Sequence, residues 1–98
     1  MSGNKFDYAE IEIELKQTHI DKGVANECDK CPGALALLEQ IPDLESVHVD
    51  TENIQFRTAM GTRVNVETPR ELRDFIILFD DGARPAPFKF KIANPLLA

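Results

Sequence analysis

The sequence predicts an α+β fold: a single, mostly antiparallel sheet in the order β-α-β-β-β-α-β, with two helices packed on one face. Two observations predict it. Alternating apolar and polar residues mark five short strands, and two segments with helical spacing of apolar residues begin directly at a proline. The length of 98 residues is that of one domain, residues 1–98, whose polar first residues, 1–7, are expected to fray.

The first expected elements are a strand and a helix. Three apolar residues within 11–15 alternate with glutamates, which is typical of a half-buried strand with one acidic face. The polar stretch 17–27 is expected to form a loop. Pro32 is suited to the first position of a helix, which places Cys31 at the N-cap, and Pro42 ends that helix. Its expected apolar stripe consists of Ala34, Leu35, Leu38 and Ile41, widened by Leu37.

Three short strands are expected to follow as a meander. Apolar and polar residues alternate in 47–50, 54–57 and 63–67. The intervening segments 50–53 and 59–61 have the composition of tight turns.

A second helix is predicted from Thr68 onward, with Thr68 as the cap, Pro69 at the first position and Glu71 completing a capping box. Its core stripe is Leu72, Phe75, Ile76 and Phe79. Ile77 and Leu78 lie beside this stripe, so the helix is apolar over more than one face. Either both sides are buried in the domain or the extra side meets another subunit, and we therefore expect a homo-oligomer.

The last expected element is a strand over 88–92. Gly82 is suited to ending the preceding helix, and the two prolines within 85–87 make an extended linker. Lys89 and Lys91 alternate with the apolar residues of this strand and have the sign to pair with the glutamates of the first strand. The first and last strands are therefore expected to be neighbours.

The charge of the chain restricts its partners. Lysines and arginines number 11 against 17 aspartates and glutamates, a net charge of −6, so duplex nucleic acid and anionic membranes are not expected as partners. All the arginines lie in residues 51–98, and one or two of them suffice to hold a small anion. No apolar run approaches the roughly 18 residues of a membrane span. The start of the chain has no apolar leader, so a cytoplasmic location is expected.

The polar side of the expected meander is the candidate ligand site. It presents His48, Gln55, Arg57, Arg63 and Asn65. Arg57 and Arg63 lie on neighbouring strands, where two guanidinium groups can hold a phosphate or carboxylate. The alternative is a solvated sheet face with ion pairs to Glu67 and Asp50.

Cys28 and Cys31 form a CxxC pair at the start of the first helix, where the helix dipole and free N–H groups favour the thiolate of Cys31. Three interpretations remain: inert structural thiols, a zinc site for which His19 and His48 are further candidates, and a redox pair. His19 is expected to anchor a loop by hydrogen bonds, with ligand binding as the alternative. No cofactor and no catalytic residue are expected.

Several short motifs occur in a characteristic order. They are His19-Ile20-x-x-Gly23, Cys31-Pro32-x-Ala34-x-Ala36-Leu37, Arg73-x-Phe75-Ile76-x-x-Phe79-Asp80-x-Gly82 and Pro85-x-Pro87-Phe88-x-Phe90. In this order the chain resembles, over about residues 10–92, a family of small proteins of tailed phages and some bacterial hosts. The resemblance implies no catalytic residue, and Cys28 departs from a pattern in which only the Cys of the Cys-Pro pair is shared. Several small phage proteins of this size act as counter-defence factors that bind signalling nucleotides or host proteins, and by analogy the resemblance implies such a role here.

Three hypotheses for function follow. The first is a non-enzymatic phage-type protein, oligomeric, that sequesters a small anionic ligand such as a signalling nucleotide. The second is a protein–protein interaction module whose acidic half, with Glu10, Glu12 and Glu14, engages a host protein. The third is a zinc or redox protein centred on Cys28 and Cys31.

Overall fold

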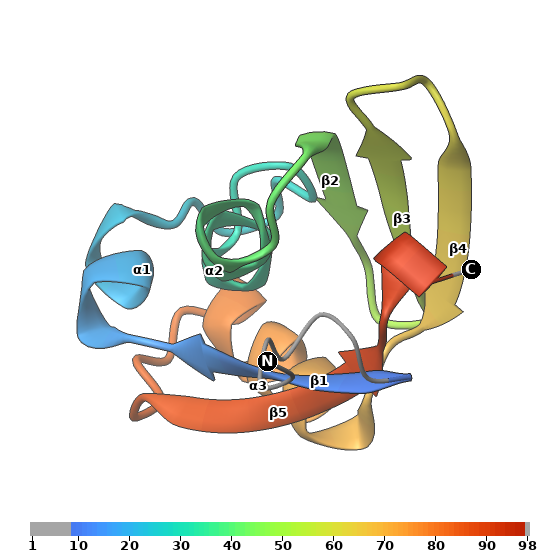
Figure 1. The fold of residues 1–98 in the computed structure, drawn as a ribbon. Coiled ribbons are helices and arrows are strands. Elements are labelled where there is room, and N and C mark those ends of the chain that lie inside the picture. Colours follow the sequence, from blue (N-terminus) through green and yellow to red (C-terminus); the bar gives the residue numbers. More distant parts are fainter. Residues whose placement is uncertain (1–8, 98) are drawn as a thin grey trace.

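A computed structural model describes residues 9–97 and shows an α+β fold with two separate antiparallel sheets (Figure 1). In chain order the elements are β1 (Glu10–Leu15), α1 (Gln17–Lys22), α2 (Pro32–Gln40), β2 (Leu44–Val49), β3 (Asn53–Thr58), β4 (Arg63–Glu67), α3 (Arg70–Asp80), β5 (Phe88–Ala93) and the 3-10 turn η2 (Pro95–Leu97). The α+β class and the five strands are confirmed, whereas the expectation of a single sheet is wrong. The expected fraying of residues 1–7 lies outside the described residues.

The first sheet pairs the two ends of the described chain. β1 and β5 run antiparallel, with Glu12 opposite Lys91 and Glu14 opposite Lys89, so the predicted neighbourhood of first and last strands is confirmed. The apolar residues of β1 are buried and its glutamates are exposed. Opposite charges therefore lie across the outer face of this ribbon, where such pairs favour the observed register.

The second sheet is the predicted meander, in the order β2-β3-β4. The turn between β2 and β3 is fixed by the Asp50 carboxylate, which accepts the backbone N–H groups of Glu52 (2.8 Å) and Asn53 (2.7 Å). Thr68 was expected to cap the following helix. Its hydroxyl instead donates to the backbone oxygen of Asp50 (2.8 Å), and Pro69 occupies the N-cap of α3 without a side-chain cap. The predicted capping box is therefore wrong, because the Thr68 hydroxyl bonds to the turn between β2 and β3 and not to the first turn of α3.

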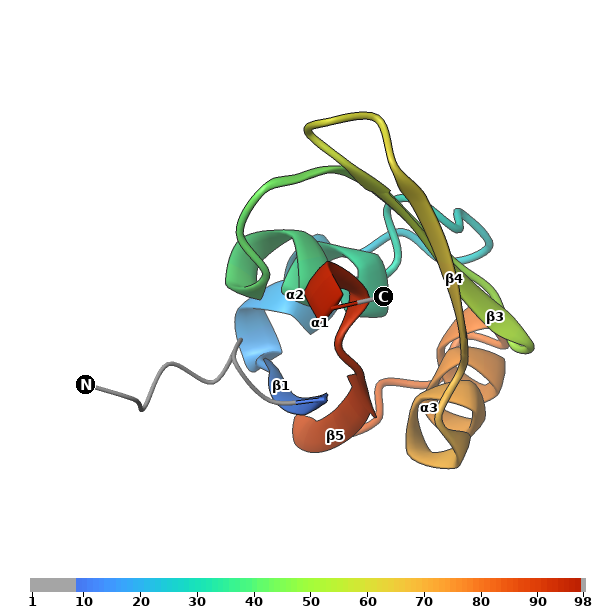
Figure 2. The ribbon, with the colours of Figure 1, turned by 45° about the vertical axis from the view of Figure 1, so that its right-hand side comes forward.

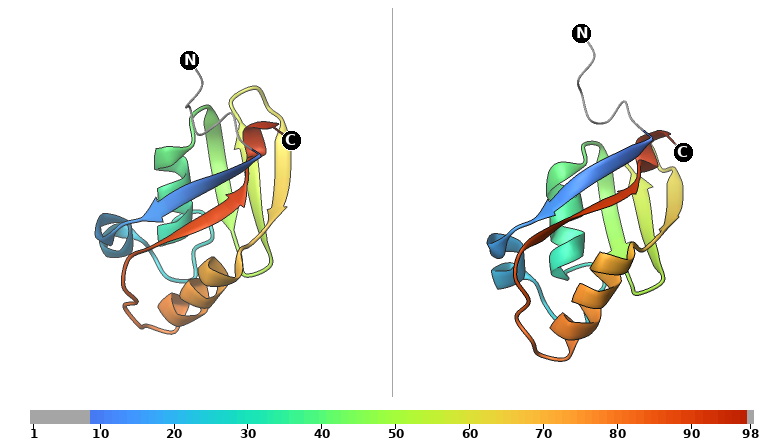
Figure 3. Two further views of the ribbon diagram at one scale, coloured as in Figure 1. Left: turned by 60° about the horizontal axis from the view of Figure 1, so that its bottom comes forward. Right: turned by 90° about the horizontal axis from the view of Figure 1, so that it is seen from below.

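The two sheets do not join because α2 lies between β1 and β2 and packs on both (Figure 1). At the free edge of β1, the side-chain amide of Gln40 in α2 pairs with Glu14: its oxygen accepts the Glu14 N–H (2.9 Å) and its nitrogen donates to the Glu14 carbonyl (2.6 Å). A side chain thus occupies a position that another strand would take. The β1–β5 ribbon consequently crosses the three-stranded sheet obliquely (Figure 3).

One hydrophobic core fills the space between the two sheets and the helices. In α3 the predicted stripe of Leu72, Phe75, Ile76 and Phe79 is buried. Phe75 stacks on Phe79 and also contacts Phe88 of β5, with ring centroids 5.8 Å and 5.3 Å apart. Figure 2 shows α3 below the three-stranded sheet, at the end opposite the β3–β4 turn. These aromatic contacts connect α3 to the two-stranded sheet.

The helices differ from the prediction in two details, and the structure decides a third that the sequence left open. Residues 17–22 form the short helix α1 instead of part of a loop. In α2, Cys31 is the N-cap as predicted, but Leu38 is 37% exposed. In α3, Ile77 and Leu78 are each about half exposed, at 53% and 51%, so the domain itself does not bury them. None of the helices within residues 9–97 has the length and apolar content that a bilayer crossing requires.

Candidate functional site

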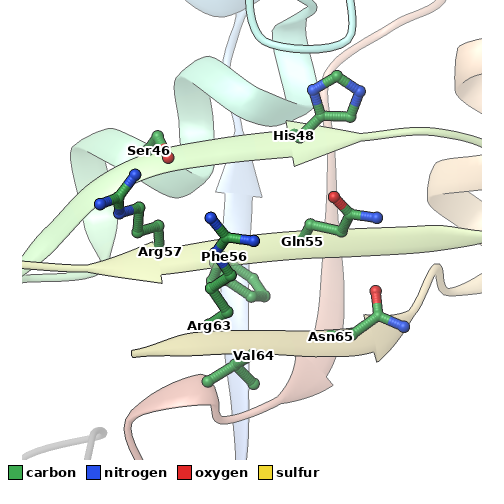
Figure 4. A pocket seen from close by; sticks show the side chains of 8 residues that line it. All are labelled: Ser46, His48, Gln55, Phe56, Arg57, Arg63, Val64 and Asn65. Atoms are coloured by element: carbon green, nitrogen blue, oxygen red, sulfur yellow. The ribbon is translucent and has the colours of Figure 1, made fainter. Parts of the chain in front are cut away.

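The outer face of the three-stranded sheet carries a shallow hollow of about 440 Å³ (Figure 4). Its lining consists of Ser46, His48, Gln55, Phe56, Arg57, Arg63, Val64 and Asn65. Four of the five residues predicted to bind a ligand lie here: His48, Gln55, Arg57 and Arg63. Asn65, which the sequence placed on the same face, completes the polar set.

The register of the meander arranges six polar side chains in two rows across the sheet. One row contains Ser46, Arg57 and Arg63, and the other contains His48, Gln55 and Asn65. Alternation along β3 turns the intervening residues, Ile54 and Phe56, into the core. Residues two apart on one strand are about 7 Å apart, which sets the separation of the two rows.

The positive charge of the hollow comes from Arg57 and Arg63, which lie directly opposite each other in the β3–β4 ladder. Like charges in this relation destabilise a sheet by a few tenths of a kcal/mol, which exposure to water reduces. Arg57 forms an ion pair with Glu45, with Nε 3.5 Å from Oε1. Arg63 has no ion pair with another described residue. The expected pairs with Glu67 and Asp50 are therefore wrong.

The sequence analysis missed Ser46 of the lining and Glu45, the ion-pair partner of Arg57. The pairing of β2 with β3 shifts its register between Leu44 and Ser46, so Glu45 is the extra residue of a bulge. Strict alternation would send its side chain to the core face, whereas the bulge lets it reach Arg57. Nothing in the sequence signals this irregularity.

His19 lies elsewhere and does not line the hollow. Its side chain is buried, its Nδ1 accepts the backbone N–H of Lys16 (2.9 Å), and its Nε2 lies 3.2 Å from Oε1 of Glu39. The structure does not place His19 at the hollow, and the contacts of its two ring nitrogens agree with the expected anchoring role. Burial of Glu39 raises the pKa of its carboxyl, but His19 and Lys16 outweigh this, so that the pKa is lower than usual.

The two cysteines are free thiols with a raised pKa. For Cys31, burial raises the pKa more than the hydrogen bonds from the Ala34 and Gly33 N–H groups lower it. For Cys28, burial and then the nearby acidic groups, Asp50 first, raise it. The expected thiolate at the helix N-terminus is therefore wrong, because desolvation exceeds the effect of the helix end.

The proposed zinc ligands are not brought together. His19 is anchored between α1 and Glu39 of α2, whereas Cys31 caps the other end of α2 and His48 lies in the hollow. Across residues 9–97, no three His, Cys, Asp or Glu side chains are grouped as a metal would need. The described geometry thus gives the zinc hypothesis no support.

A second hollow, also about 440 Å³, lies where α3 begins. It is lined by Arg70 and Arg73 but also by Glu52 and Glu67, so its charges balance. The sheet hollow has two arginines and one neighbouring carboxylate, and this surplus of positive charge makes it the better anion site. The comparisons with family models, curated proteins and solved structures found no match, so the resemblance to a phage family stays a prediction.

Proposed function

We propose that this protein is a non-enzymatic binding protein that holds a small anionic molecule on the outer face of its three-stranded sheet. The observation that carries the proposal is the direct cross-strand pair Arg57–Arg63 in a polar hollow of about 440 Å³. Two guanidinium groups on adjacent strands can each donate to different oxygens of one phosphate or carboxylate. A bound anion also offsets the repulsion between the two arginines.

The second row of the hollow favours a ligand that is more than a simple anion. His48, Gln55 and Asn65 present ring and amide groups that both donate and accept hydrogen bonds. This row lies about 7 Å from the arginine row, a separation that suits a phosphate at one end and a polar ring at the other. A nucleotide has this chemistry, so a signalling nucleotide remains the proposed ligand class.

The cellular role that we propose is sequestration in the cytoplasm, by a homo-oligomer, as a phage counter-defence factor. The surroundings of the cysteines and of His19 favour binding over catalysis. Cys31 is a buried N-cap thiol with a raised pKa, and His19 uses its ring nitrogens on Lys16 and Glu39. Neither thiol has a histidine as its hydrogen-bond partner, as an activated nucleophile would.

The acidic face proposed for a host protein receives less support. Glu12 and Glu14 lie opposite Lys91 and Lys89, so lysines of the neighbouring strand offset much of the negative charge of β1. An acidic docking face would retain its charge for the partner. We therefore rank anion binding above engagement of a host protein.

Titration calorimetry with a panel of cyclic and linear nucleotides, and with inorganic phosphate, tests this proposal. We expect one nucleotide to bind, and Arg57→Ala to weaken that binding at least about tenfold, because a charge-assisted bond to the anion is lost. Arg73→Ala removes the same charge outside the sheet hollow and is the matched control, for which binding should stay unchanged. The proposal fails if no member of the panel binds, or if both variants weaken binding equally.

A further inference from the structure

The strand β4 forms an open edge of the three-stranded sheet. β4 pairs with β3 on one side, and no other described strand pairs with its outer side. Figure 2 shows β4 at the near side of the molecule with no helix or strand in front of it. An edge of this kind presents unpaired backbone N–H and C=O groups that another strand can use.

Of the other three edges, those of β1 and β2 are each partly occupied. At the edge of β1, the amide of Gln40 pairs with both backbone groups of Glu14. At the edge of β2, the backbone N–H of Val49 donates to the carbonyl of Cys28 (2.9 Å). For residues 63–67 of β4, no backbone bond of this kind to a loop or side chain within residues 9–97 is found. β4 therefore has a more open edge than β1 or β2, and β5 and η2 are the described elements outside its own sheet that approach it.

The sequence of β4 is complementary to itself when read antiparallel. It reads Arg63-Val64-Asn65-Val66-Glu67. If a second copy runs antiparallel about Asn65, Arg63 lies opposite Glu67 of the partner subunit and Val64 lies opposite Val66 of the partner subunit. Opposite charges and paired β-branched residues both stabilise cross-strand contacts.

Within one copy, the charged residues at the two ends of β4, Arg63 and Glu67, form no ion pair with another described residue. Both are exposed. Val64 and Val66 are only half-buried although they pack against the core. A second strand at this edge would pair the charges and cover more of the two valines.

We propose that two copies of this chain associate through their β4 edges, antiparallel and centred on Asn65, into one continuous six-stranded sheet. The contact is isologous, because each Arg63–Glu67 pair occurs twice by the two-fold symmetry. It also joins the outer faces of both meanders, so that two candidate anion sites share one surface. The proposal does not depend on the ligand, because it rests on the edge of β4 and not on Arg57.

The contact involves five residues of each copy, so the area is small and the association weak. We expect a monomer–dimer equilibrium that depends on protein concentration and that shifts toward monomer at high salt, since exposed ion pairs are screened. Sedimentation velocity over a range of concentrations measures it.

Charge reversal tests the register. Arg63→Glu and Glu67→Arg should each raise the dimer dissociation constant at least about tenfold, because each change sets like charges opposite each other twice. The double variant Arg63→Glu with Glu67→Arg restores opposite charges and should dimerise like the native chain. The proposal is overturned if the double variant is as weak as the single variants, or if the native chain stays monomeric at millimolar concentration.

Disulfide trapping gives a second, independent test. In a Cys28→Ser, Cys31→Ser background with oxidised glutathione, Asn65→Cys should give a covalent dimer, because the two new thiols lie opposite each other across the symmetry axis. Gln55→Cys lies on the same face one strand further in and is the matched control, expected to give no dimer. Equal cross-linking of the two variants would contradict the central position of Asn65.

Discussion

At the scale of single residues, the imidazole ring of His19 connects the start of α1 to α2. Nδ1 accepts the Lys16 N–H at the start of α1, and Nε2 lies within hydrogen-bond distance of Glu39 in α2. This arrangement requires a proton on Nε2 and a free lone pair on Nδ1, which is one tautomer of the neutral ring. From sequence, His19 had two interpretations, because neither its burial nor a partner 20 residues away is visible in the chain.

Substitutions at His19 should separate its two hydrogen bonds. His19→Ala removes both and leaves a partly buried N–H without its acceptor, so we expect the free energy of unfolding to fall by about 1–3 kcal/mol. The amide oxygen of an Asn side chain can replace Nδ1 but cannot reach Glu39, so His19→Asn should cost less than His19→Ala. Urea unfolding followed by circular dichroism measures both. Equal losses would mean that the bond to Lys16 contributes nothing.

At the scale of elements, the junction of α1 and α2 depends on a glycine. Gly23 ends α1 with an ordinary φ of −68°, so its backbone conformation does not require glycine. A Cβ at this position would lie 2.5 Å from both Cγ and Cδ of Pro32, the first residue of α2. Gly82 differs, because its φ is +96° and no heavy atom lies near the position of its Cβ. Gly23 therefore permits the close approach of Pro32, and Gly82 permits a left-handed backbone conformation at the end of α3.

Substitution of the two glycines by alanine should lower the free energy of unfolding by different amounts. Gly23→Ala should lower the free energy of unfolding by about 2–3 kcal/mol through overpacking, and Gly82→Ala by about 1–2 kcal/mol through backbone strain. Pro32→Ala removes the two ring carbons, so the cost of Gly23→Ala should shrink in that background, while the cost of Gly82→Ala should not. A double-mutant cycle by urea unfolding checks this. An unchanged cost of Gly23→Ala in both backgrounds would contradict the steric explanation.

Local sequence signals predict elements well where one signal acts alone. The proline at 32 and the alternation in 54–57 and 63–67 each correspond to an element of the structure. Prediction failed where a residue has two competing uses. Threonine is a residue type that often caps helices, yet the hydroxyl of Thr68 donates a hydrogen bond to the backbone oxygen of Asp50 in the turn. The sequence of α1, with four exposed polar residues, did not indicate a helix, because the helix is stabilised by burial of Ile20 and His19 and not by propensity.

At the scale of the whole molecule, strand pairing between distant segments was only partly predictable. The neighbourhood of β1 and β5 followed from the opposite charges of their outer faces, because Glu12 and Glu14 alternate along β1 as Lys89 and Lys91 do along β5. The separation into two sheets depends instead on α2 and on the Gln40 amide at the β1 edge. A tertiary contact of this kind has no local pattern. The polar lining of the sheet hollow was predictable because the face of each meander residue follows from alternation.

The β1–β5 pairing closes the fold, and a truncation should show how much of the stability depends on it. A chain that ends at residue 87 lacks β5, including Phe90 and Ile92, each 2% exposed in the core. Loss of one buried phenylalanine costs about 3–5 kcal/mol, and a domain of this size has about 5–15 kcal/mol in total. We therefore expect no cooperative urea transition for this chain. A chain that ends at residue 94 keeps β5, loses only η2 and should still unfold cooperatively. If the shorter chain also unfolds cooperatively, the three-stranded sheet with its helices is a stable unit without the β1–β5 ribbon.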